Sequence, residues 1–100
     1  MRVMMKVSIP VGAGNKGIKD GSLPGTVGEF VERMKPEATY FIAEGGRRTA
    51  LFFFDLKDPT DLPSAAESFF MNLDASIDVT PAMDLADMQA GVAKIADKIA

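Results

Sequence analysis

The sequence contains no cysteine, no histidine and no tryptophan, and it has a single tyrosine. Without cysteine the chain can form neither a disulfide framework nor a thiolate nucleophile. Without histidine it has no Ser-His-Asp triad, no imidazole base, no axial histidine for haem and no zinc site of the usual Cys/His type. We therefore expect no metal site and no cofactor, and any chemistry that needs a phenol must use Tyr40.

Basic charge and long apolar runs are also scarce. The formal net charge is -3, which argues against nucleic acid, whose phosphates require a basic face, and against an anionic membrane surface. Lys6 interrupts the apolar N-terminal run, the remainder is too short for a signal peptide, and no stretch approaches the roughly 20 apolar residues of a membrane span. We expect a single cytoplasmic domain over residues 1–100, with no nucleic-acid and no membrane partner.

The hydrophobic pattern predicts strands over residues 2–10, 39–44, 49–56 and 76–83. Gly45 and Gly46 can supply the positive φ angles of a tight hairpin between the second and third strands. Pro81 has no N–H to donate to a sheet ladder, so the fourth strand should lie at an edge of the sheet or end near that residue.

Helical spacing of apolar residues predicts helices over 22–35, 62–74 and 85–99. Asp84 and Asp87 at the start of the last helix, and Lys94 and Lys98 near its end, suit the helix macrodipole. The order of elements predicts an α+β fold, a ferredoxin-like βαββαβ sandwich with an antiparallel four-stranded sheet and an extra C-terminal helix.

The stretch VGAGNKGIKDGSLPG, residues 11–25, contains the spacing G-x-G-x-x-G. In a dinucleotide-binding turn the third glycine already lies inside a helix. Here two more glycines and Pro24 follow, so we expect no helix before about Leu23 and interpret the stretch as a flexible loop. Lys16, Lys19 and the free N–H groups near Ser22 leave an anion site open as an alternative.

The third predicted strand, within ALFFFDL, is apolar on both faces, which is typical of a strand buried on both sides. The first two helices can cover only one face of the sheet, and the last helix, about 10 Å wide, cannot cover a sheet of roughly 20 Å. An exposed apolar patch on a small protein marks an interface. We predict a homodimer, formed through the sheet faces or through the stripe of the last helix, with interface residues Met4, Leu51, Phe52 and Phe53.

Polar side chains on the first and fourth strands complete a candidate ligand site. Lys6, Ser8, Asp78 and Thr80 are predicted to face away from the helices, because the first and fourth strands should be neighbours. A Lys6–Asp78 pair would orient a ligand or serve acid–base chemistry, or else form a partly wet cross-strand ion pair. With Tyr40 and Lys16 these are the expected ligand-binding residues, and no catalytic residue is assigned.

Three stretches, IKDGSLPGTVGEFVERMKPEATYF, RRTALFFFDLKDP and AAESFFMNLDASIDVTPAMDLADM, resemble small uncharacterised bacterial proteins of the dimeric α/β-barrel superfamily. The resemblance implies a ferredoxin-like protomer and a dimer that encloses a cavity between two sheets. Members of that superfamily include cofactor-free monooxygenases, haem-degrading enzymes and isomerases. The stretch LPGTVGEFVERM also resembles the start of an ACT domain, an amino-acid-binding regulatory module, through Pro24 and Gly25.

These observations favour a small homodimer that binds a small organic molecule in an apolar cavity between its sheets. A cofactor-free monooxygenase or isomerase of the dimeric α/β-barrel type is one alternative. An ACT-like module that binds an amino acid is the other.

Overall fold

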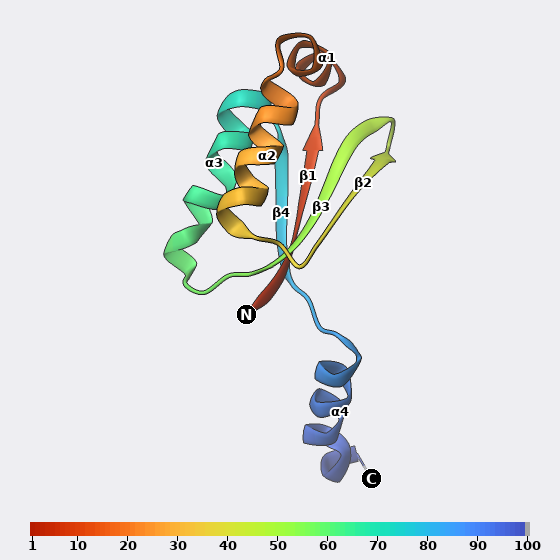
Figure 1. The fold of residues 1–100 in the computed structure, drawn as a ribbon. Helices are drawn as coiled ribbons and strands as arrows, with labels where there is room; N and C mark the ends of the chain where they lie inside the picture. Colours follow the sequence, from red (N-terminus) through yellow and green to blue (C-terminus); the bar gives the residue numbers. More distant parts are fainter. Residues whose placement is uncertain (100) are drawn as a thin grey trace.

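The computed structural model describes residues 1–99, with the backbone alone for residues 97 and 99. It is an α+β domain built on one antiparallel sheet (Figure 1). Its elements in chain order are β1 (Arg2–Ile9), α1 (Val11–Asp20), α2 (Ser22–Met34), β2 (Ala38–Glu44), β3 (Arg47–Asp55), a 3-10 turn (Pro59–Asp61), α3 (Leu62–Leu73), β4 (Ser76–Pro81) and α4 (Leu85–Ile99).

The four strands are arranged in the order β2-β3-β1-β4, and every neighbouring pair is antiparallel. The predicted hairpin is confirmed: Gly45 and Gly46 join β2 to β3 with φ angles of 60° and 77°. Such angles are strained for side chains with a Cβ atom, which explains glycine at both positions. Strand β4, which ends at Pro81, lies at an edge, as the missing N–H of proline predicts.

The core lies between the sheet and the helices α2 and α3 (Figure 1). We call this side of the sheet the inner face. Val3, Met5, Val7 and Ile9 of β1 are buried there, as are Phe52 and Phe54 of β3. Phe30 of α2 meets the ring of Phe52 with centroids 4.4 Å apart, and Phe69 of α3 packs against both. Each side chain of this size contributes about 1.5–3 kcal/mol through its burial.

The stretch between β1 and α2 differs from the sequence prediction. Residues 11–20 form a helix, α1, and not a flexible loop. Gly21 then takes a left-handed conformation, with φ 81°, and α2 begins at Ser22. The prediction was wrong because it relied on the low helix propensity of glycine, which tertiary packing can override.

Two of the glycines in α1 lie where the helix approaches its neighbours closely. A Cβ atom on Gly17 would stand 2.9 Å from Leu23 Cβ and 3.0 Å from Leu73 Cδ2, and one on Gly14 would stand 2.6 Å from the Arg48 guanidinium. The G-x-G-x-x-G spacing therefore serves helix packing: both glycines are buried, and their missing side chains let α1 lie against α2, α3 and β3.

Helix α4 stands apart from the rest of the domain (Figure 1). The molecule measures 57 Å along its longest axis against 28 and 18 Å on the others, and its radius of gyration is 16.2 Å. A compact chain of this length has a radius of gyration of about 13 Å. The apolar stripe of α4, formed by Leu85, Met88, Val92 and Ile95, is exposed along the helix.

The role of the α1 glycines is testable with two alanine substitutions in one helix. We expect Gly17→Ala to lower the free energy of unfolding by about 1–2 kcal/mol, because the new methyl group must displace Leu23 or Leu73. Gly12→Ala has open space around it and should be neutral or stabilising by up to about 1 kcal/mol. Urea denaturation of both variants measures the difference, and equal stabilities would contradict the packing role.

Candidate functional site

The face of the sheet turned away from α2 and α3 is here called the outer face, and no helix within the described residues 1–99 packs on it (Figure 1). Alternation along each strand determines which side chains it carries. They include Met4, Lys6 and Ser8 of β1, Ala38, Tyr40 and Ile42 of β2, Thr49, Leu51 and Phe53 of β3, and Ser76, Asp78 and Thr80 of β4.

The two strands β2 and β3 carry the apolar half of the outer face: Ala38, Tyr40, Ile42, Leu51 and Phe53. Tyr40 lies opposite Leu51 in the strand register, and its ring meets that of Phe53 edge-on at 6.4 Å. Tyr40 is 59% exposed, while Leu51 and Phe53 are half-buried. Met4 of β1, directly opposite Phe53, extends this apolar surface toward the centre of the sheet.

The strands β1 and β4 carry the polar half: Lys6, Ser8, Asp78 and Thr80. Lys6 lies directly opposite Asp78 in the register, as the sequence suggests. Its ion pair, however, is with Glu44 of β2, with 2.9 Å between Nζ and Oε1. That hydrogen bond is the main reason why the pKa of Lys6 is raised, and the charge of Asp78 adds a smaller effect. The expected Lys6–Asp78 pair is therefore replaced by a diagonal pair across the sheet.

Two of the predicted site residues lie elsewhere. Phe52, expected at the dimer interface, is fully buried among the core aromatics on the inner face. Neighbouring residues of a strand point to opposite faces, so Phe53 and not Phe52 belongs to the outer face. Lys16 lies on α1, beside a polar cavity of about 340 Å³ that also adjoins Asp20, Asn72 and Asp74. It does not join Lys6 and Tyr40.

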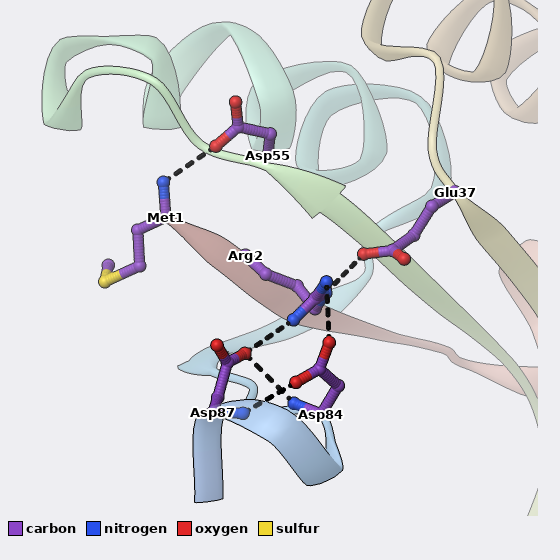
Figure 2. Close-up of polar contacts among 6 residues, drawn as sticks. All are labelled: Met1, Arg2, Glu37, Asp55, Asp84 and Asp87. Atoms are coloured by element: carbon purple, nitrogen blue, oxygen red, sulfur yellow. Dashed lines mark hydrogen bonds and ion pairs between the residues drawn. The ribbon is translucent and has the colours of Figure 1, made fainter. Parts of the chain in front are cut away.

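A cluster of charges at one end of the outer face was not anticipated from the sequence. Figure 2 shows the Arg2 guanidinium among three carboxylates. It donates to Glu37, which precedes β2, and to Asp87 Oδ2 at 2.9 Å, and it lies 3.6 Å from Asp84 Oδ2. The hydrogen bond to Glu37 is the main reason why the pKa of Arg2 is raised. Arg2 thereby joins β1, the start of β2 and the start of α4.

The first turn of α4 is closed by two reciprocal hydrogen bonds, also drawn in Figure 2. The backbone N–H of Asp87 donates to Asp84 Oδ1 at 2.8 Å, and the N–H of Asp84 donates to Asp87 Oδ2 at 3.1 Å. This is the arrangement of a capping box, which satisfies N–H groups that the helix itself leaves unpaired. Arg2 binds the same two carboxylates, so the start of α4 is fixed to the sheet.

A small cavity of about 270 Å³ opens between this charged cluster and the apolar half of the outer face. Its lining residues are Arg2, Glu37, Ala38, Tyr40, Phe53, Ala82, Met83 and Asp84. Apolar walls with a few polar groups at one end are typical of sites for small organic molecules. Of these residues, the sequence identified Tyr40 and Phe53. It did not identify Arg2, Glu37 and Met83, because they lie on β1, before β2 and after β4, and come together only in the folded chain.

A second apolar cavity, of about 350 Å³, lies on the inner face beside the edge strand β2. Leu23 and Val27 of α2, Phe41 of β2 and Ala50 of β3 line it, and Arg48 lies at its border. Phe41 points to this side and is 63% exposed because α2 does not extend over β2. The Arg48 guanidinium is held by a hydrogen bond to Asn15 Oδ1 at 3.1 Å.

No known family model matches the chain, and no curated protein matches its sequence significantly. Among residues 1–99, no helix has both the length and the apolar character that crossing a membrane requires. The geometry of the outer face is therefore the main indication of what the protein binds.

The contacts of Arg2 with Asp84 and Asp87 at the first turn of α4 predict how the pKa of Asp87 responds to a substitution of Arg2. The pKa of Asp87 is lowered, first by the Asp84 N–H and then by Arg2 among smaller causes. An aspartate with a lowered pKa stabilises the folded state above its unfolded pKa of about 3.9, and this contribution is lost as the pH falls through the lowered value.

We expect NMR titration of the aspartate carboxyl carbons to place Asp87 below an ordinary aspartate, and Arg2→Ala to raise its pKa part of the way back. Asp58 is the internal control. Its pKa is lowered by hydrogen bonds from the Thr60 hydroxyl and N–H, so the Arg2 substitution should leave it unchanged. An Asp87 pKa that does not respond to Arg2→Ala would contradict the contact between Arg2 and the first turn of α4.

Proposed function

We propose that the protein is a homodimer with a ferredoxin-like protomer of the dimeric α/β-barrel type, and that it binds a small organic molecule in a cavity between the outer faces of two sheets. The observation that supports this most directly is the apolar half of the outer face, where Tyr40, Leu51 and Phe53 lack a covering element. A soluble domain keeps such a surface when a partner or ligand covers it.

The chemistry of the outer face favours a ligand with an apolar body and one or two polar groups. Tyr40, Phe53 and Met4 offer apolar and aromatic contacts, while Lys6 and Ser8 offer hydrogen-bond donors at the middle of the sheet. Aromatic rings favour edge-on or offset contact with another ring. We therefore infer a planar or aromatic compound with an acceptor oxygen that Lys6 or Ser8 can reach.

Native mass spectrometry of the freshly purified protein tests both parts of the proposal. We expect a species of twice the 10.7 kDa chain mass, with a bound compound of a few hundred daltons retained on some of it, consistent with a pocket of this size class. A dimer without a bound compound would support the assembly and contradict ligand retention. A monomer would overturn the shared cavity.

Phe53→Asp is the substitution that tests the interface. It places a charge in the apolar half of the outer face, so we expect it to convert the dimer to a monomer without unfolding the chain, since Phe53 is only half-buried in one copy. Met71→Asp on α3 is the matched control, because Met71 is exposed and lies on the helix side of the molecule. Phe52→Asp is unsuitable, because a charge in the core would unfold the protein.

A further inference from the structure

Helix α4 and the apolar half of the outer face are two uncovered apolar surfaces of the same chain. The stripe of α4 consists of Leu85, Met88, Val92 and Ile95, and Val92 at its middle is 49% exposed. An isolated helix of 15 residues is marginal in water, and helices of this kind gain most of their stability by packing an apolar face. The stripe therefore needs a surface to pack on.

The two surfaces match in size. A helix of 15 residues is about 22 Å long and about 10 Å across. The apolar half of the outer face is two strands wide, about 10 Å, and extends along β2 from Ala38 to Ile42, about 17 Å, close to the roughly 16 Å that the stripe spans from Leu85 to Ile95. One helix can therefore cover β2 and β3 and leave the polar half of the outer face, on β1 and β4, open.

Within one copy α4 does not reach this surface. Arg2, Asp84 and Asp87 fix its first turn at the end of the sheet, and the rest of the helix runs away from the strands (Figures 1 and 2). Beyond that turn, the described side chains of α4, at residues 88–96 and 98, make no hydrogen bond or ion pair to another element. The direction of the helix is thus suited to a contact with another molecule.

We propose that α4 of a second copy covers the apolar half of the outer face, and that the two copies exchange their α4 helices reciprocally. This inference rests on the homodimer proposed above, but the partner's α4 takes the place of a second sheet over the apolar half: Met88, Val92 and Ile95 of one copy form one wall of the ligand cavity of the other. The ligand site is then incomplete in a single chain.

Reciprocal exchange also increases the surface area that each copy buries, which a stable dimer interface requires. Stable dimers bury about 800 Å² on each partner, which is more than one short helix provides. In a two-fold dimer each copy gives an α4 stripe and receives one, so every copy contributes two patches.

Sedimentation equilibrium of two matched variants tests how much the apolar stripe of α4 contributes to the free energy of dimerisation. We expect Val92→Glu to weaken dimerisation by about tenfold or more, as loss of a central apolar contact does. Ala90→Glu adds the same charge to the opposite face of α4 and should leave the dimer unchanged. Equal dissociation constants for the two variants would overturn the inference.

Isotope-filtered NOE measurements on dimers mixed from labelled and unlabelled chains test the contact itself. Tyr40 is the only tyrosine, so its ring signals are unambiguous. We expect intermolecular NOEs from the methyl groups of Met88, Val92 or Ile95 to the Tyr40 ring. NOEs found only within one chain would show that α4 folds back on its own sheet, and an absence of NOEs would show that it lies elsewhere. Both results overturn the exchange.

These results separate the two proposals. If Phe53→Asp dissociates the dimer while Val92→Glu does not and no intermolecular NOE is seen, the sheet-face dimer holds and the α4 exchange fails. If the wild-type chain is monomeric at all concentrations, the proposed function fails, and the exchange with it.

Discussion

Strand β3 is apolar on both faces, while the domain has helices on only one of them. Phe52 and Phe54 point into the core beneath α2 and α3, and Leu51 and Phe53 point the other way, where no element within residues 1–99 lies. A sheet buried on one side normally alternates apolar with polar residues. This excess of apolar surface on the outer face is the constraint on which the proposed dimer, its proposed ligand cavity and the proposed place of α4 all depend.

Arg2 joins the sheet to helix α4 beside the apolar half of the outer face. Because its guanidinium joins β1 to Glu37 before β2 and to the capping carboxylates of α4, the helix begins at the edge of the cavity that Tyr40 and Phe53 line. The charges are exposed, so each ion pair contributes little to stability. Their effect is geometric: they determine where α4 starts and in which direction it leaves the sheet.

The glycines between β1 and α2 show how a familiar spacing can arise from packing. Gly14 and Gly17 allow a short helix to approach Arg48, Leu23 and Leu73 more closely than any other residue would permit. The helix then closes one end of the core. A glycine-rich match in a sequence has this structural explanation whenever the glycines fall on the face of a helix that contacts its neighbours.

The sequence by itself determined the strands, the hairpin at Gly45 and Gly46, the edge position of β4 and the doubly apolar β3, because alternation and turn chemistry are local properties that few residues settle. It also named Tyr40 and Lys6 as ligand contacts, and the strand register of the structure places both on the outer face. Only the tertiary structure decided that residues 11–20 are helical, that Lys6 pairs with Glu44, and that Arg2 gathers carboxylates from three segments. Those outcomes depend on distances between residues far apart in the chain, where packing and charge outweigh local propensity.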